Sequence, residues 1–507
     1  LRIIGAASPE TRRLSTRLAA VLEWSGRGGE AALVYLDAAR GAPARERVEL
    51  ERAAAEQLLA CGRIDEGVLV LRGVLASMGM SAPKTLLGAL VSMLAHRAWL
   101  FLVGLRFRDR ASADVSREDR VRVDSLYSIA LGLSMVDVVL AAAMHSRHIL
   151  LALRVGDRNQ VVRAASLEAA QLASMGGPIT GRELSAMEVA GRLVERGSDT
   201  EGDAFLRGSH AIGLFLRGRW RDAHRLLDAS YEKYPNHKAG WHANAKLFAV
   251  YALFYVGDLP GMKRRAVQLL AEAEQRNDFY IVVNLRTTSM VDIELAADDP
   301  EAARAHIRQA MELWSMSGFL VQHWKAMVWA AEIELYAGEG VRACEILERD
   351  RRALARSFLL HVQYLRAATG FVRARALVAS IHGANARRAA SLREARRIGR
   401  RLEREGMAWT AAIASLVLAA VENAAGDRAA AMESLELAIH RCVVADMSVH
   451  AAVARQRLGL LIGGAEGDRR VRDADDALSA QGIVAPARYA GMVLPGRWTA
   501  GPPDEER

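Results

Sequence analysis

A short turn recurs along the chain and limits its fold more than any other feature. At each turn an apolar segment ends at Gly, and a second segment places a small or apolar residue five positions later. Gly adopts positive φ at little cost, so it ends one helix and lets the next fold back against it. The turns fall at Gly26, Gly62, Gly156, Gly218, Gly257, Asp298, Gly338 and Gly426, with Asp-Asp-Pro replacing Gly at Asp298.

The spacing of these turns indicates a repeat. From Gly218 to Gly338 they lie 39, 41 and 40 residues apart. A period near 40 leaves about 14 to 16 residues for each helix, and hairpins of that size must stack to bury their apolar faces. No segment alternates like a strand. We therefore expect an all-α protein, a TPR-like (tetratricopeptide-like) α-solenoid of stacked antiparallel helical hairpins with a repeat period near 40 residues.

Two segments rich in Gly, at 175–181 and 197–203, interrupt this pattern. They predict a boundary between an N-terminal helical-repeat block, residues 1–200, and a regular TPR-like superhelix, residues 201–494. Residues 495–507 are expected to form a disordered tail.

Two apolar segments between about residues 86 and 155 belong to the first block. Leu86–Leu105 is long enough to cross a bilayer, but His96 and Arg97 lie at its centre. An Arg at mid-bilayer costs about 2.5 to 3.5 kcal/mol. The second segment, Leu126–Val155, is interrupted by Asp137 and other polar residues. We expect both to be buried helices, and no membrane span.

Charge and cysteine content limit the partners and the compartment. The net charge is +9, but 59 acidic residues are interleaved with 68 basic ones, so a specific nucleic-acid partner is not indicated. The Arg-rich segment 387–404 also contains Glu and is expected to be a solvent-exposed helix. The three Cys are far apart, which favours the cytoplasm. No secretory signal is recognised after Leu1.

Motifs for common chemistries are missing. None of the six Lys follows Gly, as a P-loop requires, and the kinase motifs His-Arg-Asp and Asp-Phe-Gly do not occur. His145 and His148 are at helical spacing, but no further ligand accompanies them. We assign no catalytic, cofactor-binding or metal-binding residue, and leave open whether the chain is part of an enzyme.

One set of polar and aromatic residues follows the repeat. Asn244, Asn284 and Trp324 are 40 residues apart, each on the first helix of its unit. First helices line the concave surface of such solenoids, where aromatic and Arg side chains anchor partners. The alternative is ordinary packing. The candidate partner-binding groove consists of Trp241, Asn244, Asn284, Arg286, His323 and Trp324.

Short segments spread over the chain carry a family resemblance. They run from Glu56 through Gly62 to Gly67, Gly104 to Arg108, Arg147 to Leu153, Leu216 to Trp220, Asn284 to Thr287, Leu402 to Met407 and Ala445 to Met447. In this order they resemble the C-terminal helical-repeat region of large bacterial, myxobacterial-type serine/threonine protein kinases. In that family a kinase domain is followed by an ATPase-like module and then by TPR-like repeats.

The resemblance implies a non-catalytic protein-interaction and regulatory region, because the kinase and ATPase motifs have no counterpart here. Its expected partner is a kinase domain or another protein, in cis or in trans. Two alternatives remain. One is the helical-repeat sensor region of a maltose-activator-type transcription regulator, although no terminal helix-turn-helix is recognised. The other is a free-standing TPR scaffold. The partner's identity, any small-molecule effector and the oligomeric state stay open.

Overall fold

The computed structural model describes residues 9–134, 136–197, 200–233, 239–314, 318–381 and 388–499. Within these ranges every regular element is a helix, apart from an isolated bridge between Arg110 and Asp157. The prediction of an all-α protein is confirmed.

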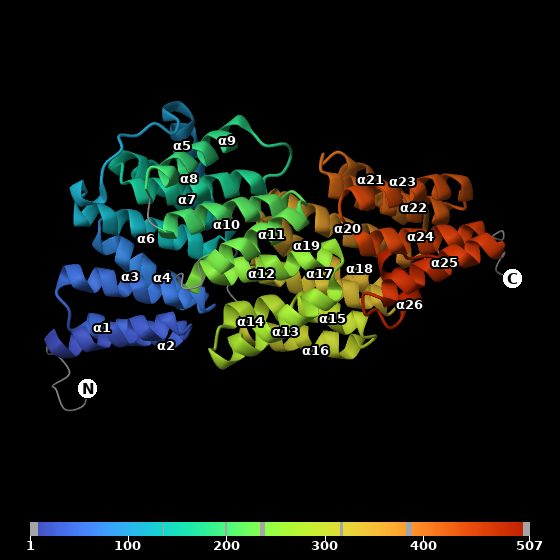
Figure 1. Cartoon of the computed structure of the whole chain (residues 1–507), viewed down its shortest axis with the longest axis horizontal. Coiled ribbons are helices and arrows are strands. Elements are labelled where there is room, and N and C mark those ends of the chain that lie inside the picture. The colour runs from blue at the N-terminus through green and yellow to red at the C-terminus, as the bar shows by residue number, and fades with distance from the viewer. Residues whose placement is uncertain are drawn as a thin grey trace.

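The helices follow one another with short connections (Figure 1). The first part of the chain contains α1 (Pro9–Trp24), α2 (Gly28–Arg40), α3 (Ala44–Ala60), α4 (Ile64–Ser77), α5 (Leu86–Val103), η1 (Ser112–Asp114), α6 (Arg117–Leu133), α7 (Val138–Val155), α8 (Arg158–Ser174), α9 (Gly181–Glu195), α10 (Thr200–Leu216), α11 (Trp220–Lys233), α12 (Ala239–Val256) and α13 (Leu259–Gln275). The second contains α14 (Phe279–Arg286), α15 (Ser289–Ala296), α16 (Pro300–Leu313), α17 (Val321–Tyr336), α18 (Gly340–Arg349), α19 (Arg351–Arg356), η2 (Leu359–His361), α20 (Gln363–Ala379), α21 (Arg388–Glu403), α22 (Ala408–Ala425), α23 (Arg428–Val444), α24 (Ser448–Ile462), α25 (Gly464–Ser479) and α26 (Pro486–Val493).

The predicted turns end helices. All eight turn residues have positive φ, including Asp298 at 64°. At that turn Asp299, and not Asp298, caps the next helix, because its carboxylate accepts a 2.9 Å hydrogen bond from the Ala302 amide. The residue five positions after each turn is buried, as the close approach of two helices requires.

Helices that follow one another in sequence pack together. Helices α1 and α2, α3 and α4, and α22 and α23 are examples of such contacting pairs, joined at Gly26, Gly62 and Gly426. These pairs are the hairpins that the turns predict.

Contacts between distant parts of the chain close the array on itself. The Tyr280 amide donates to the Cys61 carbonyl at 3.2 Å, and the Val321 amide to the Val136 carbonyl at 3.3 Å. Helix α12 also contacts α3 and α24. Helix α12 is therefore covered from several sides, and the helices around it enclose the interior of the protein.

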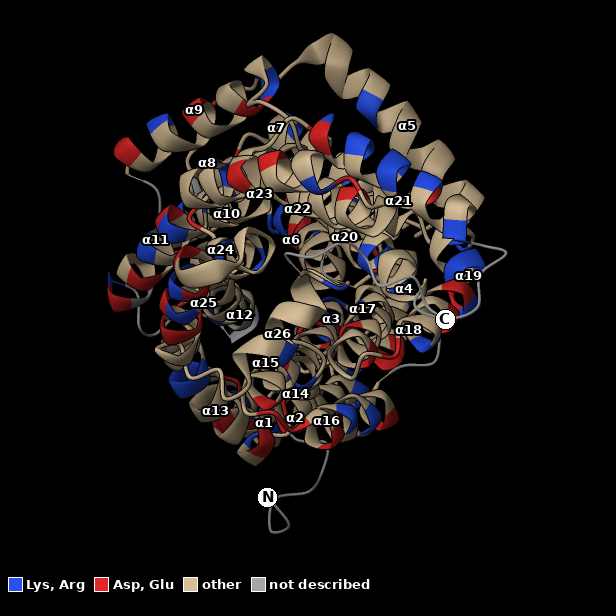
Figure 2. Ribbon diagram, turned by 90° about the vertical axis from the view of Figure 1, so that its right-hand side faces the viewer, with Lys and Arg blue, Asp and Glu red and all other residues tan. Residues whose placement is uncertain are grey.

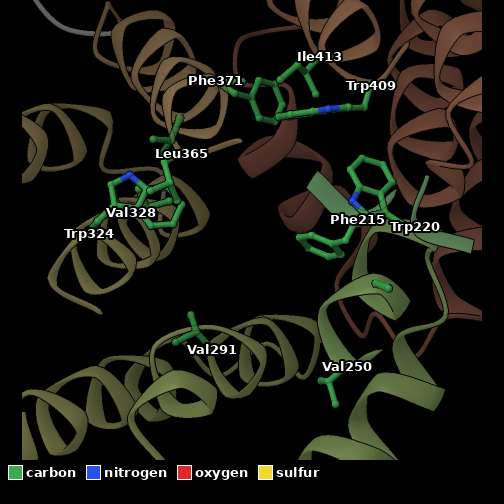
Figure 3. Packing of buried hydrophobic residues seen from close by; sticks show 14 of the residues in the cluster. Phe215, Trp220, Val250, Val291, Trp324, Val328, Leu365, Phe371, Trp409 and Ile413 are labelled. Carbon is green, nitrogen blue, oxygen red and sulfur yellow. The ribbon is translucent and has the colours of Figure 1, made fainter. Parts of the chain in front are cut away.

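Aromatic side chains form part of the buried core between these helices (Figure 3). Trp220 stacks on Tyr255 with ring centroids 4.2 Å apart, and Trp409 lies next to Trp220 at 5.9 Å. Trp220 and Trp324 are both completely buried. Large rigid rings of this kind join the separate helical layers into one core.

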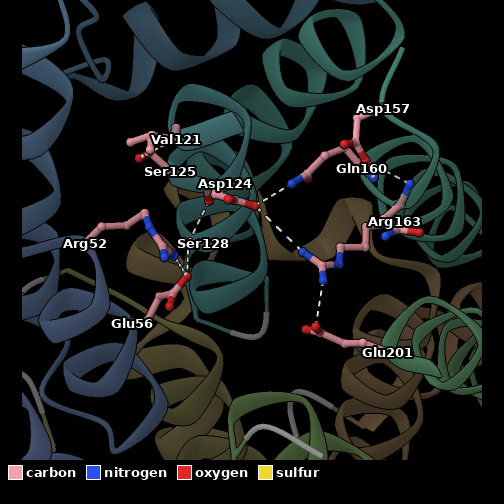
Figure 4. A network of polar contacts seen from close by, with 11 residues as sticks. Arg52, Glu56, Val121, Asp124, Ser125, Ser128, Asp157, Gln160, Arg163 and Glu201 are labelled. Atoms are coloured by element: carbon pink, nitrogen blue, oxygen red, sulfur yellow. Dashed lines mark hydrogen bonds and ion pairs between the residues drawn. The ribbon is translucent and has the colours of Figure 1, made fainter. Parts of the chain in front are cut away.

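A polar network ties α3, α6, α8 and α10 together (Figure 4). Asp124 accepts a 2.6 Å hydrogen bond from Gln160, and Arg163 pairs with Glu201 at 2.7 Å. Ser128 donates to Glu56 across the α3–α6 contact. Ion pairs and hydrogen bonds of this kind, partly shielded from water, help to fix the register between helices.

Three of the described helices are long and apolar enough to cross a membrane: α5, α7 and α22. In the most apolar stretch of each helix, the share that is buried is 72% for α7 and 67% for α22, but only 11% for α5. The expectation of a buried helix is therefore confirmed for α7 and wrong for α5. Helix α5 packs on α7 through a narrow strip in which Ala89 and Leu100 are buried and Leu90 and Met93 are half-buried, and most of its remaining residues are exposed.

The C-terminal end is packed further than expected. Trp498 is buried, and the Asn423 side chain donates to the Arg497 carbonyl at 2.8 Å. Residues 495–499 therefore lie against the core, although a disordered tail was expected from residue 495. Residues 500–507 lie outside the described residues.

Candidate functional site

The column predicted from the repeat spacing lies inside the protein. Asn244 on α12, Asn284 on α14 and Trp324 on α17 are all buried. The backbone of Trp241 belongs to α12, but its side chain lies outside the described residues. No open groove is formed by the described members of this column, and their role as partner anchors stays a prediction.

Each Asn of the column accepts a hydrogen bond from a residue on a later helix. The Tyr280 hydroxyl donates to Asn244 Oδ1 at 2.7 Å, and Lys325 Nζ donates to Asn284 Oδ1 at 2.5 Å. Trp324 Nε1 donates to the Thr369 hydroxyl at 2.8 Å. These hydrogen bonds join separate helices and satisfy buried polar side chains.

Arg286 and His323 take part in other contacts. Arg286 is half-buried and pairs with Glu274 at 2.6 Å, away from the column. His323 Nδ1 accepts a 3.1 Å hydrogen bond from the Leu320 amide at the start of α17. Both side chains therefore hold helix ends in place.

The column borders a large interior cavity. Its volume is about 710 Å³, within the range of roughly 300 to 1,000 Å³ common for small-molecule sites. Asn244 and Trp324 both line it, and most of the other lining side chains are apolar, from α5, α7, α8, α10, α12, α17 and the segment before α20. Because Leu94, Met175 and Arg182 are exposed and also line the cavity, it reaches the surface beside α5.

Lys325 is the most unusual polar residue of this cavity. Its amino group donates to the Tyr251 hydroxyl at 3.0 Å and lies 4.6 Å from the centre of the Tyr251 ring. No carboxylate pairs with it in the described part of the chain. Burial lowers the pKa of Lys325 from 10.5 to about 7, so a large fraction of this amine is uncharged near neutral pH.

A buried acid lies on the same side of the cavity. Asp292 on α15 lines the cavity, and Trp329 Nε1 donates to its Oδ1 at 3.0 Å. Burial raises the pKa of Asp292 well above its ordinary value, which favours the protonated form, and a protonated carboxyl can donate a hydrogen bond.

A second polar cluster approaches the cavity from α5, α7 and α8. Arg97 pairs with Glu168 at 2.6 Å, and His145 Nε2 lies 3.0 Å from the same carboxylate. Burial lowers the pKa of His145, so the neutral ring donates through Nε2. His145 Nδ1 and the Ser209 hydroxyl are buried and have no hydrogen-bond partner among the described residues, and both residues line the cavity.

Sequence reasoning missed the cavity and its polar groups. Lys325 directly follows Trp324 and is one of only six Lys, which is the one local signal that could have drawn attention to it. Asp292 carries no such signal, and the sequence marks His145 only by its helical spacing from His148. Helices distant in sequence bring both residues to the cavity.

No protein-family model matches the chain, and no curated protein matches it significantly. Within the described ranges, no group of three or more His, Cys, Asp or Glu side chains is placed to hold a metal ion.

Proposed function

We propose that this chain is a non-catalytic regulatory region, a TPR-like α-solenoid that senses a small molecule in its interior cavity. The observation that supports this proposal is a mostly apolar cavity of about 710 Å³ with polar groups at a few points. Such cavities are typical of ligand sites and cost stability when they stay empty.

The polar groups indicate the class of ligand. Lys325 has two hydrogen bonds to neighbouring side chains, and its charged form would have a third donor to offer. A ligand carboxylate beside Lys325 would favour the charged amine and relieve its cost of burial. The ligand is therefore a mostly apolar molecule with one carboxylate or carbonyl oxygen.

Asn284 and Trp324 are buried, so a protein partner has no direct access to them. Their burial favours a small-molecule sensor over a partner-binding groove. Regulation of a serine/threonine kinase, in cis or in trans, rests on the family resemblance, as does a cytoplasmic location. In this scheme the ligand changes how the helical array presents its outer surface to that kinase.

Isothermal titration of the full chain with dodecanoate and with dodecanol tests the sensor proposal. Dodecanoate should bind with one site per chain, and Lys325→Met should weaken dodecanoate binding at least tenfold while changing dodecanol binding little. Lys263→Met, at an exposed position on α13, is the matched control and should bind as the unchanged chain does. Absence of binding by both compounds, or equal loss in both variants, would overturn the proposal.

A further inference from the structure

Helix α5 lies at the outer edge of the molecule (Figure 2), and most of its large apolar side chains are exposed. Leu87, Phe101 and Leu102 are each at least 70% exposed. Single exposed apolar residues are ordinary on a protein surface, but a continuous exposed apolar surface along a helix marks an interaction site. The most exposed large apolar side chains of α5 are Leu87, Val91, Leu94, Trp99, Phe101 and Leu102.

The one Arg within α5 does not interrupt this surface. Arg97 turns toward the protein, where it pairs with Glu168 and bonds to Gln171. These contacts attach the middle of α5 to α8, so that α5 lies along the surface of the protein. The helix therefore presents one long side outward and keeps its charge on the inner side.

The segment that contains α5 is basic, and the acid paired with its Arg97 is Glu168 on α8. The chain has no Asp or Glu between Glu66 and Asp109, and α7 has none. Exposed cations lie at both ends of α5, with Lys84 before it and Arg106 and Arg108 after it.

A cavity of about 500 Å³ opens at the C-terminal end of α5. Its lining includes Trp99, Arg106, Arg147 and Arg154, and no carboxylate. Arg106 and Arg154 have no ion pair or side-chain hydrogen bond in the described part of the molecule, and the Arg147 guanidinium donates to the Ser81 carbonyl. The size and charge of this cavity suit a phosphate-bearing headgroup.

We infer that α5 docks in the plane of a membrane containing anionic lipids, with its exposed apolar side chains between the lipid headgroups and the Arg-lined cavity at a lipid phosphate. Exposed apolar side chains that include Trp, with Arg at the end of the helix, suit the headgroup region of such a membrane. A second copy of this chain fits less well, because a symmetric contact would bring two basic surfaces together without acids to pair them. This docking goes beyond the sensor function and does not depend on it.

Flotation of the full chain with lipid vesicles tests the inference. The chain should float with vesicles of phosphatidylcholine and phosphatidylglycerol, and stay unbound with phosphatidylcholine alone. Leu87→Gln/Leu102→Gln and Arg106→Glu/Arg154→Glu should each reduce flotation at least tenfold and keep the helical circular dichroism. Val443→Gln/Val444→Gln, at exposed apolar positions on α23, is the matched control and should float normally.

Quenching of tryptophan fluorescence tests whether α5 is the part of the protein that contacts the lipid. Brominated phosphatidylglycerol should quench part of the fluorescence, and Trp99→Phe should abolish that quenching, whereas Trp24→Phe at the exposed end of α1 should keep it. No flotation with anionic vesicles, or unchanged flotation of the α5 variants, would overturn the inference. Dimers in light scattering that dissociate in the Leu87→Gln/Leu102→Gln variant would also overturn it, because the occupant would then be a second copy.

Discussion

Lys325 Nζ lies 3.0 Å from the Tyr251 hydroxyl inside the cavity, where α17 meets α12. The two residues are 74 positions apart in the sequence, and the contact joins helices of different hairpins. An amine held in this way, without a carboxylate, is costly to bury when charged. Such a cost is commonly retained at sites that bind a ligand.

The buried amine should make stability depend on pH. Between its folded pKa of about 7 and its ordinary value of 10.5, the unfolded chain holds a proton that the folded chain has released. The free energy of unfolding contributed by Lys325 therefore rises with pH across this window, by up to about 1.4 kcal/mol for each pH unit.

At pH 7 the unchanged chain should have a lower free energy of unfolding than Lys325→Met. This difference should shrink as the pH approaches 10. Urea unfolding at several pH values measures this difference. Lys263→Met, on the surface of α13, controls for loss of a Lys elsewhere. A stability difference for Lys325→Met that stays constant with pH would contradict a buried, uncharged amine.

The turn residues should differ in their tolerance of a side chain. A Cβ at Gly62 would lie 2.7 Å from the Tyr280 amide nitrogen, whereas a Cβ at Gly338 would meet nothing within 4 Å. Both have positive φ, so Gly338→Ala should cost about 1 to 2 kcal/mol from backbone strain alone. Gly62→Ala should cost clearly more, measured by chemical unfolding, because α14 must also move. Equal costs would argue against the close contact between these turns.

Replacement of Trp324 should affect folding before it affects any partner. The side chain is completely buried and bonded to Thr369, so Trp324→Ala should lose about 3 to 5 kcal/mol. Arg286→Ala, at a half-buried ion pair, should lose less. Thermal unfolding of both variants checks this order, and the reverse order would be inconsistent with the buried position of Trp324.

Glu168 should be important for the attachment of α5. The hydrogen bond from His145 and the charge of Arg97 outweigh burial and lower the pKa of Glu168 to about 2. Glu168→Gln leaves Arg97 without its counter-ion and should cost about 3 kcal/mol. Glu66→Gln breaks an exposed pair with Arg63 and should cost less than about 1 kcal/mol. Hydrogen exchange should show faster opening of α5 in Glu168→Gln only.

The chain should transfer no phosphate by itself. Incubation of the purified chain with labelled ATP and a generic protein acceptor should leave the acceptor unlabelled, because the lysine and acidic residues of the kinase motifs are missing. Labelling that depends on this chain would contradict its assignment as a non-catalytic region.

The local features of this fold could be predicted from the sequence. Positive φ at Gly218 or Gly426 is a property of the residue and its neighbours, and it gives a turn wherever it follows an apolar helix. The buried Ala223 and Ala431, five positions later, follow from the same geometry. All-helical character follows from these turns.

Long-range features could not be predicted in this way. Hydropathy describes α5 and α7 alike, but only the tertiary contacts determine that α7 is covered and α5 is not. The cavity depends on contacts such as Val321 with Val136, which no local pattern specifies. Hence the spacing of Asn244 and Asn284 does not reveal that both side chains are buried, or that Lys325 bonds to Asn284.

A crystal structure of the chain with bromododecanoate tests the central claim most directly. The account predicts an anomalous bromine peak inside the cavity, with the carboxylate of the ligand within hydrogen-bonding distance of Lys325 Nζ. A saturated crystal with no bromine in the cavity, or with bromine only on the outer surface, would contradict the assignment of this cavity as a ligand site.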